Sequence, residues 1–223
     1  MHAALLIPVK TLANAKQRLG DAYDQHHRTL LAEAMLRDVL AAVSGVTACV
    51  EVFLVTGDAR ASALAAEFAC GVIEDRRNAS ETAAIEMATG WCEGRGYDTT
   101  IVIPADIPLI TAAELQRVID AAPEEGVLIV PAYDRRGSNC VLRRPASIIP
   151  LRFGNDSFLP HCEAARRTGM PLVILEIPGI GLDIDHPHEL ELLCARPGDT
   201  HAQRLLRSWR YSASRSPAWE AAG

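Results

Sequence analysis

The fold is decided by residues 99–121, which read TTIVIPADIPLITAAELQRVIDA. The first part of this segment is a short run of β-branched and apolar residues, as is typical of a buried strand. The run ends at Asp106, between two prolines, and Thr111-Ala112-Ala113-Glu114 then follows as a helix capping box. The segment therefore predicts a strand, a loop that carries a carboxylate, and a helix.

The same alternation of strand and helix extends along the chain in both directions, and it predicts an α/β fold around a mainly parallel sheet. The expected strands are Ala3–Val9, Val50–Thr56, Gly71–Ile73, Thr99–Ile103, Val127–Pro131, Asn139–Leu142 and Leu172–Ile177. The expected helices are Arg28–Val43, Ala59–Phe68, Ser80–Cys92, Thr111–Ala121, a helix that ends near Thr168, and Pro187–Leu193. The strand Asn139–Leu142 follows a turn-forming segment, so we expect it to be antiparallel at an edge of the sheet.

The length of 223 residues fits one domain, residues 1–195, with a short appendage. Residues 196–223 are rich in Arg, Ser, Pro and Ala, which predicts a C-terminal tail that is at most partly ordered. We expect Trp209, Tyr211 and Trp219 in this tail to pack against the domain or to contact a second copy of the chain in a homodimer.

Composition excludes several classes of function. Hydrophobic residues make up 49% of the chain and charged residues 22%, as in a globular protein with a substantial core. The net charge of -6 gives no general basic surface for nucleic acid. The apolar runs are too short to cross a bilayer and leave no room for a secretion signal, so we expect a cytoplasmic protein. The cysteines are widely spaced and are expected to be buried free thiols: Cys49, Cys70, Cys92, Cys140, Cys162 and Cys194.

Asp183 and Asp185 are separated by a single residue. Alternate side chains of an extended segment point to the same side, so both carboxylates can face one point while Leu182 and Ile184 face the interior. With Asp106 at the end of another strand, the pair predicts a site for Mg²⁺, which prefers oxygen ligands shared between carboxylates and substrate phosphates.

Two of these aspartates have an alternative role. Asp106 can form a turn or cap a helix, and Asp185 can cap the helix that begins near Pro187. Capping does not explain Asp183, because one helix start needs only one cap.

A cationic loop follows the first expected strand and contains Lys10, Lys16 and Arg18. In open α/β sheets, ligands bind at the carboxyl ends of the strands, and the loop after the first strand commonly holds phosphates. These three residues are therefore candidate ligands of a nucleoside triphosphate. A solvated basic loop is the alternative.

Residues 154–157, which read GNDS, precede the helix that ends near Thr168. Free backbone N–H groups at such a helix start can bind a phosphate or a carboxylate. Asp156 or Ser157 can instead cap the helix, and the two roles are compatible because the first turn has several unpaired donors. We expect His161 to lie near this anion site; the alternative is that it is only a surface or packing residue of the helix.

Five motifs, taken in their order along the chain, resemble the motifs of one family of enzymes. They are PVK and AKQRL (8–10 and 15–19), PADIP (104–108), GSN (137–139), FGNDSF (153–158) with His161, and LDID (182–185). Together they resemble the guanylyltransferases of deazaflavin coenzyme F-420 biosynthesis, which act on 2-phospho-L-lactate, phosphoenolpyruvate or 3-phosphoglycerate. The resemblance extends from about residue 5 to residue 193.

The resemblance implies a single-domain α/β nucleotidyltransferase that is Rossmann-like and similar to the molybdenum-cofactor guanylyltransferases. It implies transfer of GMP from GTP to the phosphate of a three-carbon phospho-acid, with release of pyrophosphate. The product would pass to a downstream enzyme of the same biosynthesis.

The motifs also assign residues to roles. By resemblance, the catalytic set is Lys16, which would contact the GTP phosphates, together with Asp106, Asp183 and Asp185, which would hold Mg²⁺. Ser138, Gly154 and Ser157 would contact the phosphorylated acid.

Two features depart from the family pattern. Ser138 stands where the family more often has threonine, and it retains the hydroxyl. Arg76 and Arg77 replace small residues near the expected base pocket. Asn78 and Ser80 remain able to cap the next helix and to donate hydrogen bonds to the base or ribose.

Two other functions compete with this interpretation. Molybdenum-cofactor and sugar-phosphate nucleotidyltransferases usually carry a glycine-rich loop with an arginine after the first strand, and this chain has no glycine between Met1 and Leu19. A non-catalytic nucleotide-binding module is the other alternative, and the intact set of three aspartates argues against it.

Overall fold

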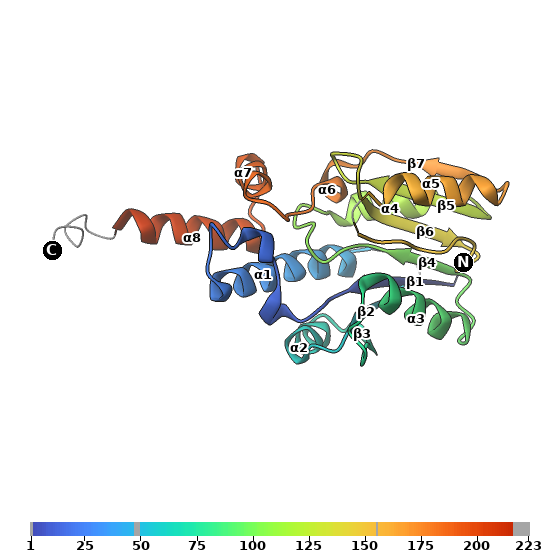
Figure 1. Ribbon diagram of the computed structural model, residues 1–223, viewed down its shortest axis with the longest axis horizontal. Helices are drawn as coiled ribbons and strands as arrows, with labels where there is room; N and C mark the ends of the chain where they lie inside the picture. Colours follow the sequence, from blue (N-terminus) through green and yellow to red (C-terminus); the bar gives the residue numbers. More distant parts are fainter. Residues whose placement is uncertain (1, 47–49, 155, 216–223) are drawn as a thin grey trace.

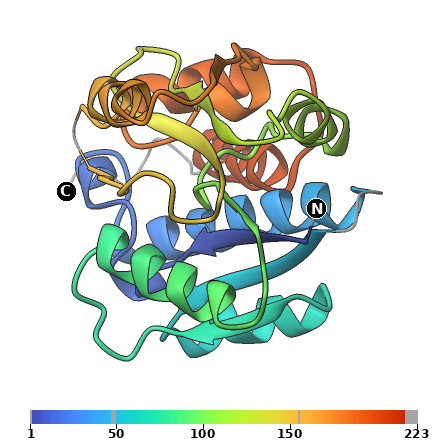
Figure 2. The same cartoon turned by 90° about the vertical axis from the view of Figure 1, so that its right-hand side faces the viewer.

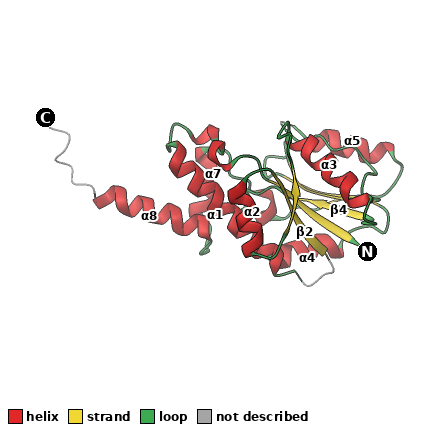
Figure 3. Cartoon of the chain, turned by 90° about the horizontal axis from the view of Figure 1, so that it is seen from below, coloured by secondary structure: helices red, strands yellow, loops and turns green. Residues whose placement is uncertain are grey.

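The computed structural model describes residues 2–46, 50–154 and 156–215. These residues form a seven-stranded sheet of order β3-β2-β1-β4-β6-β5-β7, covered by helices on both faces (Figures 1 and 3). The strands are β1 (Ala3–Pro8), β2 (Val50–Thr56), β3 (Gly71–Glu74), β4 (Thr99–Val102), β5 (Gly126–Pro131), β6 (Ser138–Arg144) and β7 (Leu172–Ile174). The α-helices are α1 (Gln25–Ser44), α2 (Ala59–Glu67), α3 (Glu81–Glu93), α4 (Ala112–Asp120), α5 (Phe158–Arg167), α6 (Pro178–Gly181), α7 (Pro187–Ala195) and α8 (His201–Arg215). Two short 3-10 helices, η1 (Leu12–Asn14) and η2 (Gln17–Leu19), lie in the loop between β1 and α1.

The predicted α/β architecture is confirmed, and the capping box at Thr111 and Glu114 is present at the start of α4. Within the described ranges, no helix is long and apolar enough to cross a membrane. The five described cysteines are free thiols, of which Cys92, Cys140 and Cys162 are buried while Cys70 and Cys194 are half-buried. Cys49 lies outside the described residues.

Strand β6 was expected at an edge of the sheet, and this expectation was wrong. β6 is antiparallel, as predicted, but it lies between β4 and β5, with Val141 opposite both Val102 and Ile129. The residues from Cys140 to Arg143 are fully buried, so the strand is covered on both faces. Its sequence, SNCVLRR, is not a continuous apolar run, so the interior position of the strand could not be recognised from its residues alone.

The sheet packs against two helical layers (Figure 2). Leu5 and Ile7 of β1 belong to a core shared with α1, α2 and α4, whereas Ala4 and Leu6 belong to a core shared with α3 and α5. This alternation follows from the two-residue period of a strand. A third cluster joins α7 and α8 to α1 and to the buried side chain of Ile184.

Helix α8 lies within residues 196–223, where the sequence predicted a tail, and it extends beyond the sheet beside α1 (Figure 1). Its start carries a local capping pair, in which Thr200 Oγ1 accepts the N–H of Gln203 at 3.2 Å and Gln203 Oε1 accepts the N–H of Thr200 at 3.2 Å. Asp38 of α1 also accepts the backbone N–H groups of His201 and Ala202 at 2.6 and 2.9 Å. The Trp209 ring lies 4.9 Å from the ring of Tyr23. The side chains of Tyr211 and Trp219 lie outside the described residues.

Candidate active site

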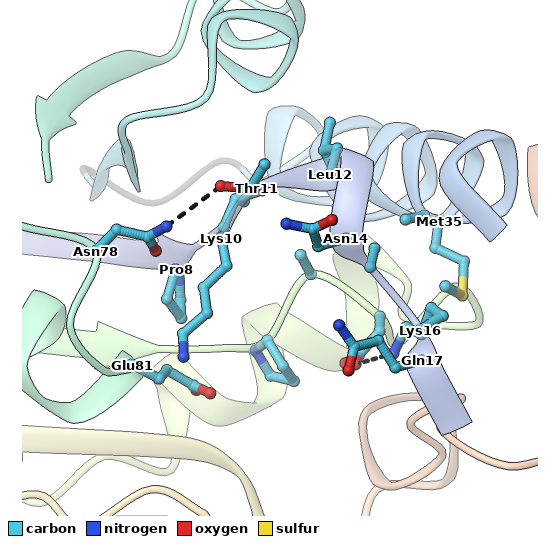
Figure 4. A pocket seen from close by; sticks show the side chains of 16 residues that line it. Pro8, Lys10, Thr11, Leu12, Asn14, Lys16, Gln17, Met35, Asn78 and Glu81 are labelled. Carbon is cyan, nitrogen blue, oxygen red and sulfur yellow. Dashed lines mark hydrogen bonds and ion pairs between the residues drawn. The ribbon is translucent and has the colours of Figure 1, made fainter. Parts of the chain in front are cut away.

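A pocket opens where β1 and β4 end (Figure 4). Its volume is about 500 Å³, within the usual range for sites that bind small molecules. The walls come from the loop after β1, the start of α3 and the segment after β4. The polar lining residues are Lys10, Thr11, Asn14, Lys16, Gln17, Asn78, Glu81 and Asp106.

Lys16 holds the centre of the site. Its backbone is left-handed, with φ at 55°, between η1 and η2. Its Nζ donates to Asp106 Oδ2 and to Asp185 Oδ1, the latter at 2.9 Å, and its side chain is 8% exposed. Burial alone would lower the pKa of Lys16, but the two carboxylates raise it above its ordinary value. Lys16 is therefore not part of a solvated loop, although Lys10 and Arg18 are exposed.

Asp106 does not cap a helix, because Thr111 caps α4. Its Oδ2 accepts from Lys16, whereas its Oδ1 is buried and has no hydrogen-bond partner among the described residues. The backbone oxygen of Asp106 accepts the N–H of Ile184 at 3.0 Å. This contact places the Asp183–Asp185 segment beside the end of β4.

Asp183 and Asp185 meet different partners. Asp183 Oδ1 accepts from Asn139 Nδ2 at 2.9 Å. Burial, together with the charge of Asp106, raises the pKa of Asp183 to about 6. Asp185 accepts from Lys16 and also from Arg18 at 2.9 Å; burial would raise its pKa, but these two cations lower it below its ordinary value.

Asp185 is not the cap of α7. Glu189 accepts the backbone N–H groups of Asp185 and of His186, the latter at 2.8 Å, so a residue of the helix itself satisfies these donors. As expected, Leu182 and Ile184 are buried, at 5% and 0% exposure.

The site is acidic, but its aspartates are not arranged as a ready metal cage. Among residues 2–46, 50–154 and 156–215, no group of three or more His, Cys, Asp or Glu side chains is placed to hold a metal ion. In this arrangement the Lys16 ammonium is the cation between Asp106 and Asp185. The assignment of three aspartates to Mg²⁺ therefore stays a prediction.

Sequence reasoning missed Glu81, the first residue of α3, which faces the pocket near Lys10 (Figure 4). Burial and the charge of Asp106 raise the pKa of Glu81 to about 7, against the opposing effect of Lys10. The sequence showed only that Glu81 follows the helix cap Ser80, which accepts the N–H of Ala83 at 3.0 Å, and not that its side chain faces the pocket.

The other residues near the expected base pocket have local partners. Asn78 lines the pocket, has a left-handed backbone, and donates from Nδ2 to Thr11 Oγ1 at 3.2 Å (Figure 4). Arg76 is exposed and pairs with Glu74 at 2.9 Å.

The residues expected to hold the acid form a second group at the start of β6. Because β6 runs antiparallel to β4, its first residue, Ser138, lies beside the carboxyl end of β4. The Ser138 N–H donates to Ser157 Oγ at 3.0 Å. Ser157 therefore does not cap α5, and this alternative was wrong.

Two further residues complete the loop before α5. Asp156 pairs with Arg136 at 2.7 Å, and neither Asp156 nor Ser157 makes a side-chain cap bond. Gly154 has φ at +124°, and a Cβ there would have nothing within 4 Å. The backbone conformation, rather than a lack of space, therefore favours glycine at position 154.

The two groups of residues are connected through consecutive positions of β6. Ser138 reaches Ser157, whereas the next residue, Asn139, reaches Asp183. Neighbouring residues of a strand point to opposite faces, so the start of β6 contacts both groups. The geometry thus brings together a cationic pocket, a set of carboxylates and a pair of hydroxyls where β1 and β4 end and β6 begins.

The family model of CofC-like guanylyl transferases matches residues 3–221. The chain belongs to this family. A phosphoenolpyruvate guanylyltransferase from Roseiflexus castenholzii is 34% identical over 209 residues, which cover 94% of this chain and 96% of the relative. A 2-phospho-L-lactate guanylyltransferase from Methanothermobacter thermautotrophicus is 30% identical over 95% of this chain and 93% of its own length. A 3-phospho-D-glycerate guanylyltransferase from Colwellia psychrerythraea is 29% identical over 86% of this chain and 91% of its own length.

Solved structures place this CofC-like chain in the nucleotidyltransferase fold. A structure assigned as a nucleotide-diphospho-sugar transferase, from Desulfovibrio desulfuricans, has a TM-score of 0.77 at 20% identity and covers 94% of this chain and 96% of its own. A nucleotidyl transferase from Methanothermobacter has a TM-score of 0.58 at 16% identity, with coverage of 93% and 99%. The chain is therefore a nucleotidyltransferase by family, and it shares the fold of these solved structures.

Proposed function

We propose that this protein transfers GMP from GTP to the phosphate of a small three-carbon phospho-acid and releases pyrophosphate. The acid is phosphoenolpyruvate, 2-phospho-L-lactate or 3-phosphoglycerate, the acceptors named in the relatives. The product belongs to coenzyme F-420 biosynthesis. The observation that carries the proposal is the ion pair of Lys16 with Asp106 and Asp185, which joins the phosphate-binding loop to the acidic segment at one pocket.

In this reaction an oxygen of the acid's phosphate bonds to the α-phosphorus of GTP, and the bond from that phosphorus to the bridging oxygen of pyrophosphate breaks. The nucleophile is already anionic at neutral pH, so no general base is required. Charge neutralisation and in-line placement of the two phosphates are required instead. A site built from lysines, carboxylates and hydroxyls meets this requirement.

The cationic loop is assigned to the triphosphate. Lys10 and Lys16 line the pocket, and Arg18 reaches it through Asp185. Each of these cations can neutralise phosphate oxygens. Asn78, in the pocket wall, and Ser80, at the start of α3, are assigned to the base or ribose.

The donor set suits a Mg²⁺ ion, with Asp106, Asp183 and Asp185 as the residues that would hold it. Asp106 has a buried carboxylate oxygen without a hydrogen-bond partner in the described part of the chain, and burial, together with the charge of Asp106, raises the pKa of Asp183. When bound, the ion would neutralise charge on the transferring phosphoryl group. Lys16 forms ion pairs with two of the three carboxylates, Asp106 and Asp185.

The binding of the phospho-acid is assigned to the residues that carry hydroxyls, Ser138 and Ser157. Ser138 and Ser157 lie at adjoining ends of β6 and α5, and Gly154 precedes Ser157 in a loop where a Cβ on the glycine would meet nothing within 4 Å. A phospho-acid presents a carboxylate and a phosphate, and hydroxyl donors suit both groups.

A competition assay tests the proposal. Purified protein is incubated with GTP, Mg²⁺ and equal concentrations of the three acids, and the products are resolved by mass while pyrophosphate is quantified. We expect one guanylylated acid to dominate, with one pyrophosphate released per product, and little product when ATP replaces GTP. Pyrophosphate release without any guanylylated acid would contradict the proposal.

A further inference from the structure

A buried chain of hydrogen bonds links His161 in α5 to the start of β6. His161 is 1% exposed and Ser138 is 7% exposed. The Nδ1 atom of His161 lies 3.0 Å from Ser138 Oγ, and its Nε2 atom accepts the backbone N–H of Arg152 at 2.8 Å. The roles assigned above give this imidazole ring no task.

The contact with Arg152 decides which nitrogen of the ring carries the proton. A ring nitrogen that accepts an N–H bond has no proton of its own, so the proton of the neutral ring is on Nδ1. Burial, together with the charge of Arg143, lowers the pKa of His161 to about 4, which keeps the ring neutral at physiological pH. Nδ1–H therefore donates to Ser138 Oγ.

This donation sets the direction of the Ser138 hydroxyl. A serine hydroxyl has one proton and can accept at its oxygen, so an oxygen that accepts from His161 leaves its own proton to be donated elsewhere. Ser157 Oγ is placed in the same way, because it accepts the Ser138 N–H at 3.0 Å. Both hydroxyls are thus held as donors, the polarity that suits anionic oxygens.

His161 also holds the loop that carries Gly154. Its Nε2 atom binds the backbone of Arg152, and its ring packs edge-to-face against Phe153 with centroids 5.4 Å apart. Phe153 in turn receives a second support, because its N–H donates to Thr82 Oγ1 at 2.9 Å. One ring therefore fixes both the hydroxyl and the glycine loop.

We propose that His161 is a positioning residue of the acid site, which holds the Ser138 hydroxyl as a donor toward the phosphorylated acid. This inference rests on the proposed function, because that function assigns Ser138 to the acid. His161 acts through Ser138 and the loop and does not itself contact the substrate.

Two variants separate the donor role from simple packing. In His161→Asn the amide nitrogen takes the place of Nδ1 and retains a donor to Ser138. In His161→Gln the amide reaches the place of Nε2 and retains an acceptor for Arg152, but the donor to Ser138 is lost. We expect His161→Gln to raise the KM for the acid roughly ten-fold, the range of one hydrogen bond to a charged group, and His161→Asn to raise it about three-fold at most. The KM for GTP should stay the same in both variants.

The tautomer is measured separately by ¹⁵N NMR of the wild-type ring, assigned by the loss of its signal in His161→Asn. We expect a protonated Nδ1 and an unprotonated Nε2 from pH 6 to pH 8. A proton on Nε2, a charged ring, or the same acid KM in both variants would overturn the role of His161. If the wild-type protein guanylylates none of the three acids, the proposed function fails instead, and the NMR result still decides whether the ring is a donor to Ser138.

Discussion

The ammonium of Lys16 lies 2.9 Å from a carboxylate oxygen of Asp185, although 169 positions separate the two residues in the chain. This ion pair ties the loop after β1 to the segment before α7. Asp106 contacts the same ammonium, so one positive charge is shared by two carboxylates, of which Asp106 lines the pocket. The protein itself therefore partly neutralises the negative charge of these carboxylates.

The chain contains only two lysines, Lys10 and Lys16, and replacing each by alanine should have different effects. Lys16→Ala should reduce turnover or raise the KM for GTP, and should lower stability by about 1–3 kcal/mol because two partly buried carboxylates lose their partner. Lys10→Ala is the matched control for stability: Lys10 is exposed, so the melting temperature should hold while the KM for GTP rises. A change in the acid KM alone would move Lys16 to the acceptor site.

The stability lost in Lys16→Ala should depend on pH. The cations Lys16 and Arg18 lower the pKa of Asp185, so their stabilisation is present above the ordinary pKa of an aspartate and is lost as the pH falls through the lowered value. The difference in melting temperature between wild type and Lys16→Ala should therefore be largest near neutral pH and shrink in acid. A difference that grows as the pH falls would contradict this ion pairing.

Asp183→Asn should abolish nearly all turnover while leaving the fold intact, because an amide is a poor Mg²⁺ ligand of almost the same shape. The bond to Asn139 survives through the amide oxygen. Without GTP, millimolar Mg²⁺ should raise the melting temperature of the wild-type protein, since it relieves the repulsion between Asp183 and Asp106. The variant should show a smaller shift. Equal shifts, or near-normal activity of Asp183→Asn at limiting Mg²⁺, would remove Asp183 from the metal site.

Glu81→Gln should stabilise the protein in a pH-dependent way. Burial and Asp106 raise the pKa of Glu81 from 4.5 to about 7 in the folded state, so the folded protein binds a proton more tightly than the unfolded chain. Stability is then lost as the pH rises through this range. Glutamine does not titrate, so the variant should match wild type at pH 4 and exceed it at pH 8 by up to roughly 3 kcal/mol. Urea unfolding at the two pH values measures this; a variant less stable at pH 8 would refute it.

Ser157→Ala tests the acid site, and Thr111→Ala, a change in the cap of a different helix, is its control. Loss of this hydroxyl leaves the buried Ser138 N–H without its acceptor, so stability should fall by about 1–3 kcal/mol. The KM for the acid should also rise, while that for GTP stays constant. Thr111→Ala, which removes the cap of α4, should cost about 1 kcal/mol and change neither KM. If both variants lower stability and neither changes the KM for the acid, Ser157 has only a structural role.

The sequence predicted the fold from local signals, namely the periodicity of strands and helices and the capping box at Thr111. Its errors concern long-range order. The position of β6 inside the sheet depends on its pairing with β4 and β5, which cannot be predicted from the residues of β6 alone. Likewise, Asp38 accepts the N–H of His201 from 163 positions earlier in the chain, a contact that adds to the local capping pair of Thr200 and Gln203.

The candidate site divides in the same way. The resemblance placed Lys16 and the three aspartates in one catalytic set, and in the structure Lys16 contacts two of them, Asp106 and Asp185. The partners of Asp183 and Ser157 were not predictable, because Asn139 and the Ser138 N–H reach them only after β6 has entered the sheet. Glu81 was missed because its pKa depends on burial against Asp106, which only the folded chain provides.

In the proposed reaction, the phosphate of the acid attacks the α-phosphorus of GTP at this pocket. The most direct measurement is ³¹P NMR of the product formed from GTP and a phospho-acid whose phosphate oxygens are labelled with ¹⁸O. We predict two coupled resonances of a new diphosphate linkage that retains ¹⁸O in the bridge, together with unlabelled pyrophosphate. Label in the released pyrophosphate, or conversion of GTP to GMP with the acid unchanged, would contradict the account.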